Sequence, residues 1–310
     1  MSEEVYHIPA LLPQTLESLD IKPDGIYVDA TFGGGGHSRA ILGMLGPKGR
    51  LLGFDQDADA LANAPADPRF TFVRSNFRFI RNFLRYHGID RVDGILADLG
   101  VSFHHFDDPE RGFSFRSDAP LDMRMNRRSP LTAAALLADI SDRDLLSLLR
   151  TYTDIKDPAK AAKAIMAAGQ KSPIDTTFRL AEAVRPALNP KSEKKEMAQV
   201  FQALRIAVNS EMEALTDLLT AMPDVLKEEG RAVILTYHSV EDRLVKNFFR
   251  SGNIEGNIEK DFFGKVICDW RLINRSPITA DPEEVERNPR SRSAKLRAAA
   301  FTGEDGAKRQ

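Results

Sequence analysis

The stretch Val28-Asp29-Ala30-Thr31-Phe32-Gly33-Gly34-Gly35-Gly36-His37-Ser38 decides the fold. An apolar strand runs into four consecutive glycines, and a helical segment from Arg39 to Leu45 follows. Glycine has no Cβ, so the backbone of such a turn can lie against a ligand and present N–H groups at a helix N-terminus. A second strand ends in Asp55, 19 residues after Gly36. An acidic residue near this spacing binds a ribose hydroxyl in nucleotide-binding βαβ units, so the sequence predicts an adenosine-containing cofactor.

Size and composition narrow the class of protein. The chain has 310 residues, 42% of them hydrophobic, and a net charge of −2. Its length predicts one large α/β domain with a smaller unit. No apolar run approaches the roughly 20 residues that span a bilayer, and the acidic N-terminus is not a signal peptide. A single cysteine excludes an internal disulfide and fits a reducing cytoplasm, so a cytoplasmic protein without a membrane partner is expected.

The strand pattern predicts a doubly wound, largely parallel sheet. Helical stretches separate the first four strands, as in βαβ units. About 130 residues then precede the fifth strand, which is too long for a simple crossover. We predict that residues 120–195 form an inserted all-helical domain and that 1–119 and 196–310 form one discontinuous α/β domain. The predicted strands are 26–30, 50–55, 70–74, 94–98 and 232–238, followed by 265–272 and 294–301.

Capping signals place the helices of the insertion. Ser141 resembles the start of a capping box, Asp157-Pro158 gives an N-cap with an N1 proline, and Asp175 or Thr176 caps a further helix. Apolar residues at helical spacing from Met197 to Leu219 predict one long helix that closes the insertion. Beside that stripe lies a polar strip, which is either a solvated edge or the lining of a cleft: Gln202, Arg205 and Asn209.

Three further side chains near the glycine turn each allow two interpretations. In open α/β sheets, ligands lie at the carboxyl ends of the strands. Asp98 ends the fourth strand and is either a site residue or a loop cap. Phe77, just past the third strand, either stacks on an adenine or packs in the core. His37 either caps the turn or contacts the cofactor. A strict GxGxxG pattern is absent, which argues against a nicotinamide site.

The fifth strand leads into Thr236-Tyr237-His238-Ser239-Val240-Glu241-Asp242-Arg243. Polar residues at this strand end are expected to face the same cleft. Ser239 is a favourable N-cap for a helix over 241–249, with Asp242 at its third position, so both are assigned to capping. His238 is left as a residue for the substrate side and, with Asp98, as a catalytic residue.

Two basic runs suit phosphate contacts, although such runs also occur on solvated faces. One spans 287–297 and the other spans 123–128. Cys268 sits in an apolar strand and is expected to be a buried small hydrophobe rather than a nucleophile. No histidine or cysteine spacing matches a zinc site, so no metal is expected.

These segments together resemble a known family, the bacterial 16S ribosomal RNA cytosine-N4 methyltransferases (the RsmH, formerly MraW, family). The matching pieces span nearly the whole chain. The most specific are Glu110–Phe115, Pro120–Met125, Arg205–Glu211 and His238–Asp242.

The resemblance implies a class I, Rossmann-like, S-adenosylmethionine-dependent methyltransferase fold in which the inserted helical domain binds substrate. It implies methylation of the exocyclic N4 of one cytidine in the decoding region of 16S RNA within the small ribosomal subunit. No DNA partner is expected, and a monomer or a homodimer is compatible with the sequence. The cofactor contacts carried over by position are Gly35, Gly36, His37, Asp55, Phe77 and Asp98. His105 stands where the family usually has a glutamine contact.

The chemistry of methyl transfer to a cytosine N4 predicts roles for a few side chains. A carboxylate or carbonyl that accepts an N4–H bond localises the nitrogen lone pair, and Asp98 is placed to do so. The target base must leave its stack, and Phe113, Phe115 or His238 could stack on it. Three alternatives stay open. They are a nicotinamide-dependent dehydrogenase, a non-catalytic RNA-binding assembly factor, and a methyltransferase of another nucleic acid or of a small-molecule amine.

Overall fold

The computed structural model describes residues 9–100, 108–264 and 266–303. The chain divides into two compact units. We call residues 1–100 and 213–310 the sheet unit, and residues 101–212 the helical unit.

The bounds of the helical unit differ from those predicted for the insertion. It begins at residue 101 rather than 120 and ends at 212 rather than 195. The reason lies in its core, because Phe113 on one side and Phe201 and Val208 on the other pack in the same buried cluster as the helices between them. Side chains that the sequence assigned to the α/β domain are therefore part of the helical core.

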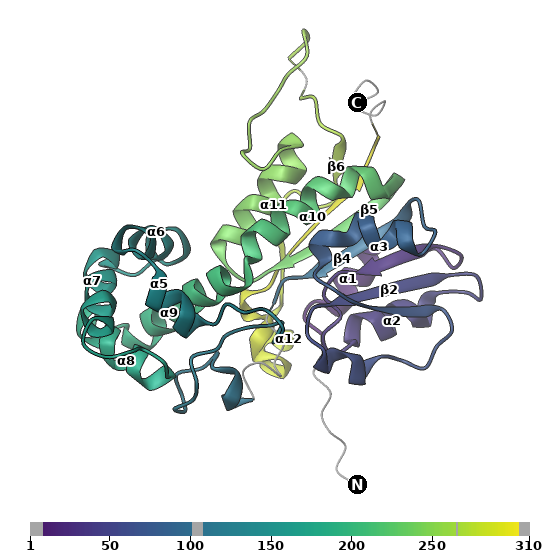
Figure 1. Cartoon of the computed structure of the whole chain (residues 1–310). Helices are drawn as coiled ribbons and strands as arrows, with labels where there is room; N and C mark the ends of the chain where they lie inside the picture. Colours follow the sequence, from purple (N-terminus) through teal and green to yellow (C-terminus); the bar gives the residue numbers. More distant parts are fainter. Residues whose placement is uncertain (1–8, 101–107, 265, 304–310) are drawn as a thin grey trace. The chain divides into compact units, whose positions relative to one another are not determined.

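The sheet unit contains one eight-stranded sheet, and this confirms the predicted α/β fold class. Its order is β3-β2-β1-β4-β5-β8-β6, with β7 paired to β8; β1 to β5 are parallel and β8 is antiparallel to its neighbours (Figure 1). The predicted strand over 265–272 is mostly wrong, since only its last three residues form β6. The strands are β1 Ile26–Asp29, β2 Arg50–Asp55, β3 Phe70–Arg74, β4 Val92–Asp98, β5 Leu226–Thr236, β6 Trp270–Leu272, β7 Ile278–Thr279 and β8 Lys295–Phe301.

Helices cover both faces of this sheet. The strands carry apolar residues on both sides, so each face of the sheet needs a covering layer. On one face, α1 (Leu12–Leu19) and α2 (Gly36–Met44) share a buried cluster with Leu96, Leu235 and Leu296. On the other, α11 (Ser239–Ser251) packs on β5, β6 and β8. The remaining elements of this unit are α3 Ile80–Tyr86, α10 Glu211–Val225, α12 Pro282–Arg287, and the 3₁₀ turns η1 Asp59–Asn63, η2 Phe77–Phe79 and η5 Pro289–Ser293.

The helical unit contains the helices that its capping signals predict. Ser141 accepts a hydrogen bond from the backbone of Asp144, Asp157 caps α7 with Pro158 at N1, and Thr176 rather than Asp175 caps α8. Each cap satisfies an N–H that the helix leaves without a partner. The helices are α5 Ala133–Asp139, α6 Asp142–Tyr152, α7 Pro158–Gly169, α8 Thr177–Val184 and α9 Glu193–Asn209, with 3₁₀ turns η3 Pro109–Arg111 and η4 Arg185–Ala187.

The predicted single helix through Met197 and Leu219 is wrong, because it is broken between α9 and α10. Ser210 adopts a left-handed backbone with φ 47° and ends α9. Beside the break, the Asn209 amide donates to the Met123 carbonyl at 2.8 Å and its oxygen accepts from the Met125 N–H at 2.8 Å, and an Arg205–Glu211 ion pair spans the break. Within the polar strip of α9, Asn209 therefore binds the segment 123–125, while Arg205 pairs with Glu211 through Nε at 2.8 Å.

Arg111 fixes the same segment from the other side. Its side chain is buried and donates to the carbonyls of Arg124 and Met125 at 3.0 and 3.1 Å. We expect Arg111→Met to lower the unfolding free energy of the helical unit by about 2–3 kcal/mol, because two partly buried carbonyls lose a charged donor. Denaturant titration followed by circular dichroism measures this. The exposed Arg116→Met is the matched control, and an equal loss in both variants would contradict the assignment.

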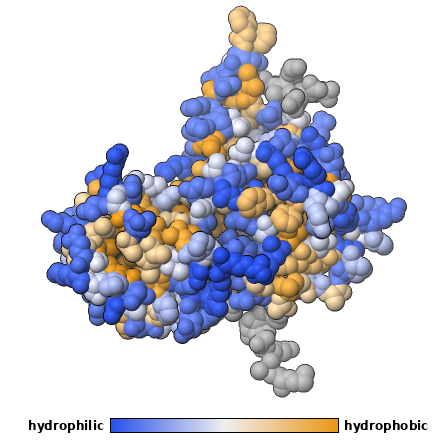
Figure 2. Space-filling model, in the orientation of Figure 1, coloured by the Kyte–Doolittle hydropathy of each residue, from blue (hydrophilic) through white to orange (hydrophobic). Residues whose placement is uncertain are grey.

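One segment of the sheet unit projects beyond the sheet. It follows α11 and precedes β6 (Figure 1), and its tip is apolar in Figure 2. Phe262 and Phe263 are 98% and 89% exposed there. Within the described residues, no helix is both long enough and apolar enough to span a membrane.

Candidate active site

The glycine turn between β1 and α2 has the backbone that the sequence predicts. Gly35 has φ +71°, and a Cβ there would lie 2.8 Å from the Phe32 ring. A Cβ on Gly36 would lie 2.4 Å from Cγ of Pro9. Both positions therefore need glycine, one for its conformation and one for close approach. The turn leaves the N-terminus of α2 at the carboxyl edge of the sheet, where ligands bind in open α/β folds.

Asp55 ends β2 beside this turn. Its Oδ2 accepts from the Gly33 N–H at 2.8 Å, and its Oδ1 accepts from the Asp57 N–H at 2.8 Å. Burial raises the pKa of Asp55 to about 6, although these two hydrogen bonds oppose the shift. A carboxylate oxygen has two lone pairs, so both oxygens can accept a further hydrogen bond from ribose hydroxyls.

A buried polar group connects β1 to α2. Asp29 accepts from the Ser38 hydroxyl at 2.7 Å and from the Thr31 N–H at 3.1 Å. Burial raises the pKa of Asp29, while the nearby His37 and the Ser38 hydrogen bond act against that rise. His37 is buried, and its Nε2 lies 3.2 Å from the Ala10 carbonyl oxygen. Sequence reasoning gave Asp29 no role, although its place at the end of β1 was a usable signal.

Asp98 stands at the end of β4, next to β1. Its N–H donates to the Thr31 hydroxyl at 2.6 Å, and its Oδ2 lies 3.8 Å from Nδ1 of His37. Its Oδ1 is buried and has no hydrogen-bond partner among the described residues. Because an unpartnered buried carboxylate oxygen is costly, this atom is the strongest sign that the site receives a ligand group.

Tyr237 is a neighbour of Asp98 that sequence reasoning did not select. It follows β5, and a Cβ on Gly100 would lie 2.9 Å from its ring. Burial raises the pKa of its hydroxyl, and Asp98 raises it further, so the phenol stays protonated. The pairing of β4 with β5, which brings Asp98 opposite Leu235, places it there.

Phe77 and His105 complete the predicted cofactor contacts. Phe77 begins η2 and is half-buried at the end of β3, beside β2. The preceding Asn76 donates to Gln56 Oε1 at 3.2 Å. Because Gln56 directly follows Asp55, this hydrogen bond holds the turn near Asp55. His105 lies outside the described residues.

The capping roles predicted after β5 are wrong. His238, not Ser239, is the N-cap of α11: its Nδ1 accepts from the Glu241 N–H at 3.4 Å, and Glu241 accepts from the His238 N–H at 3.3 Å. An imidazole nitrogen can replace a serine oxygen in this role. Asp242 instead accepts from Nε of Arg297 at 2.7 Å, and this pairing helps to lower the pKa of Asp242.

Much of the predicted basic surface is used within the protein. Arg124 pairs with Asp122, Arg127 with Asp108, and Arg297 with Asp242. Phe113 is buried in the helical core, so it is not a base-stacking residue, whereas Phe115 packs against Phe201 and stays partly exposed.

Cys268 is half-buried rather than buried. Burial raises the pKa of its thiol, so a thiolate nucleophile is disfavoured. The described part of the chain contains no group of three or more metal-ligating side chains.

The residues at the carboxyl edge of the sheet fit an adenosine-containing cofactor. The glycine turn has open space at Gly34, where a Cβ would meet no atom within 4 Å, and Asp55 offers acceptors for a ribose. Gly35, Gly36, His37, Asp55, Phe77 and Asp98 all lie at or just beyond the ends of β1 to β4.

Comparison with known proteins identifies the family of this chain. The model of the MraW methylase family matches residues 4–302. The Ribosomal RNA small subunit methyltransferase H of Bacteroides thetaiotaomicron is 56% identical over 297 residues, which cover 96% of this chain and 98% of that protein. The protein of the same name from Parabacteroides distasonis is 56% identical over 298 residues, with the same coverage. A solved rRNA methylase from Streptococcus thermophilus is 10% identical with TM-score 0.41, covers 93% of this chain and 94% of its own, and adds nothing to the assignment. The chain belongs to the MraW methylase family, and it is a methyltransferase.

Proposed function

We propose that this enzyme transfers a methyl group from S-adenosylmethionine to the exocyclic N4 of one cytidine in the decoding region of 16S ribosomal RNA. The observation that carries the proposal is the 56% identity, over 96% of this chain, to a protein named as a small-subunit ribosomal RNA methyltransferase. The site supports it, since its acceptors and glycine turn suit the adenosine part of this cofactor. We also infer that the enzyme acts in the cytoplasm, on RNA of the small subunit.

The bound cofactor supplies an electrophilic methyl group on a sulfonium. The protein must hold the acceptor nitrogen in line with that methyl and exclude water. The N4 lone pair of cytosine is delocalised into the ring, so a carboxylate that accepts an N4–H bond makes it more nucleophilic. Asp98 is the group we assign to this role, because its buried Oδ1 has an open acceptor position. His238, at the end of β5, is proposed to lie on the substrate side.

The cofactor contacts proposed from the family resemblance are Gly35, Gly36, His37, Asp55, Phe77 and Asp98. We propose Asp55 for the ribose hydroxyls and Phe77 for the adenine. His105 is proposed to take the place of the family's glutamine. The helical unit is proposed to bind RNA that flanks the target base, because the exposed Arg128 and Arg116 lie on its surface.

The raised pKa of Asp55 makes cofactor binding depend on pH. With a pKa of about 6 the carboxyl group is ionised at pH 7.5. At pH 5 it is about nine-tenths protonated and accepts fewer hydrogen bonds from a ribose. We expect the affinity for S-adenosylmethionine to fall by up to about tenfold from pH 7.5 to pH 5. Calorimetric titration measures this, and Asp55→Asn should bind weakly with a flat profile. A flat profile in the wild type would contradict the role.

The decisive test of function is methyl transfer to small subunits purified from cells that lack the enzyme, with labelled S-adenosylmethionine and identification of the product nucleoside. We expect label in N4-methylcytidine or its 2′-O-methylated form. Binding of S-adenosylmethionine without any label in the subunits would favour the alternative of another methyl acceptor, which is another nucleic acid or a small-molecule amine. Subunit binding without any methyl transfer would favour a non-catalytic assembly factor.

A further inference from the structure

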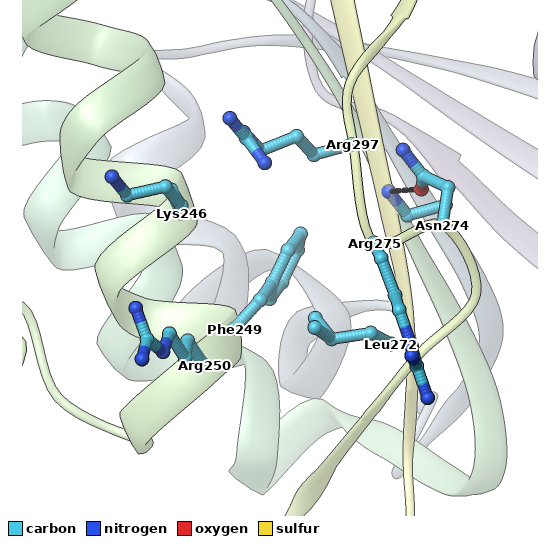
Figure 3. A pocket seen from close by; sticks show the side chains of 8 residues that line it. Lys246, Phe249, Arg250, Leu272, Asn274, Arg275 and Arg297 are labelled. Atoms are coloured by element: carbon cyan, nitrogen blue, oxygen red, sulfur yellow. Dashed lines mark hydrogen bonds between the residues drawn. The ribbon is translucent and has the colours of Figure 1, made fainter. Parts of the chain in front are cut away.

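A basic pocket lies in the sheet unit, away from the glycine turn. It is a cavity of about 250 Å³ between α11, β6 with the loop that follows it, and β8 (Figure 3). Phe249 and Leu272 form its apolar part. Four cations line the basic pocket: Lys246, Arg250, Arg275 and Arg297.

Arg297 is the cation of the basic pocket whose position the protein fixes. Its side chain is only 10% exposed, and Nε donates to Asp242 Oδ1 at 2.7 Å. That bond leaves the terminal nitrogens of the guanidinium for the pocket, and Figure 3 shows them directed across it toward α11. Lys295 shares the same carboxylate, with Nζ 3.5 Å from Asp242 Oδ2.

The pocket carries an excess of positive charge. Four cations and no carboxylate line it, and of the four only Arg297 pairs with a carboxylate, that of Asp242, which Lys295 also contacts. Lys246, Arg250 and Arg275 are exposed, and none of them pairs with a carboxylate in the described part of the chain. Cations that line one pocket without carboxylate partners favour the binding of an anion there.

The loop that carries Arg275 is held in place. The Oδ1 of Asn274 accepts from the Ala298 N–H at 2.7 Å, and its Nδ2 donates to the carbonyls of Ser276 at 2.7 Å and Leu296 at 3.0 Å. Figure 3 shows the bond to Ala298. All hydrogen-bonding atoms of the Asn274 amide are used within the protein. Asn274 therefore holds the loop that carries Arg275, and a ligand in the pocket would be bound by the cations. Such preorganisation lowers the entropic cost of holding a ligand.

We infer that the basic pocket binds a backbone phosphate of the substrate RNA, outside the site of methyl transfer. This rests on the proposed function. A guanidinium group can bind two phosphate oxygens at once, and an apolar wall beside it suits a sugar or base. The pocket lies away from the carboxyl edge of the sheet, because Arg297 and Ala298 pair with Ile234 and Val233 inside β5 and Lys246 and Arg250 lie in the second half of α11. The phosphate therefore belongs to RNA that flanks the target nucleotide, and the pocket helps to hold that RNA on the enzyme.

The test compares two variants of the whole enzyme, with small subunits as methyl acceptor. The pocket variant is Lys246→Ala/Arg250→Ala/Arg275→Ala. The control is Lys48→Ala/Arg85→Ala, which removes two exposed cations elsewhere in the sheet unit. We expect the pocket variant to raise KM for subunits about tenfold, with kcat at saturation changed less than twofold, and the control to match the wild type. The slope of log(kcat/KM) against log[KCl] should fall by about 0.7–1.

Two outcomes overturn the inference. One is an unchanged KM and salt slope in the pocket variant. The other is an unchanged KM in a variant that loses binding of inorganic phosphate, which would assign the pocket to a free anion. Failure of the proposed function looks different, because the wild type itself would transfer no methyl group. Filter binding of 16S RNA by the wild type and the pocket variant would then still decide the role of the pocket.

Discussion

Asp98→Asn is expected to lower kcat for methyl transfer by about 10²–10³-fold at saturating cofactor and RNA. The buried Oδ1 of Asp98 has an open acceptor position, and the amide replacement puts a donor or a weaker acceptor at that point. It can no longer localise the N4 lone pair by accepting its hydrogen. The fold should persist, because the backbone N–H of residue 98 still donates to Thr31 and the amide fills nearly the same volume beside His37 and Tyr237. Single-turnover transfer of labelled methyl measures the effect.

The matched control is Asp90→Asn, an exposed carboxylate just before the other end of the same strand. It should keep the wild-type rate. Normal turnover by Asp98→Asn would remove the carboxylate from the mechanism and would leave a backbone carbonyl as the acceptor. An equal fall in both variants would point to a general loss of stability.

Gly35→Ala is expected to reduce affinity for S-adenosylmethionine about 100-fold and to destabilise the sheet unit by about 2 kcal/mol or more. The left-handed backbone at φ +71° disfavours alanine, and its Cβ would meet the Phe32 ring at 2.8 Å. That ring cannot easily move, since it packs against Phe70 and Phe72 with centroids 5.2 and 5.5 Å away. The turn must then open, and the N–H groups at the start of α2 change position. Calorimetry and thermal unfolding measure the two effects.

Gly43→Ala is the control for this variant, since it lies in the same helix and its new methyl group would meet no atom within 4 Å. It should stabilise α2 by about 0.5–1 kcal/mol and leave cofactor affinity unchanged. Wild-type affinity in Gly35→Ala would show that the turn does not contact the cofactor.

The sheet was predictable because its signals are local. Apolar runs, glycines and an acid at the end of β2 follow one another in the order that a parallel sheet requires, so β1 to β4 lie where they were predicted. The predicted helix between β2 and β3 is instead the short turn η1, because Pro65 and Pro68 follow it and do not allow the helix to continue.

The break at Ser210 left no such signal. The apolar repeat continues in register on both sides of Ser210. A glycine would have indicated a left-handed residue that ends a helix, but a serine does not. At the break, Asn209 binds a segment more than 80 residues earlier, a contact that no local pattern contains. The bounds of the helical unit were missed for the same reason.

In the candidate site, too, the residues with a local sequence signal were predicted and those without one were missed. Asp55, Asp98 and the glycines were found because each ends a recognisable strand. Tyr237 was missed as a partner of Asp98 because β4 and β5 meet only in the folded sheet. The capping role of His238 was not predicted, because imidazole is an uncommon N-cap and the more usual Ser239 is the next residue.

The position of the helical unit in the chain sets an order of folding. It lies between β4 and β5, which pair in parallel although 127 residues (99–225) separate them. Closing a flexible loop of that length costs about 4 kcal/mol plus a constant in chain entropy. Helices form from near neighbours, so residues 101–212 can become compact first and shorten the loop that remains. We expect β5 to pair with β4 only after the helical unit is compact, and β8 with β6 and β7 to join the parallel strands through β5, so that Tyr237 reaches Asp98 late in folding.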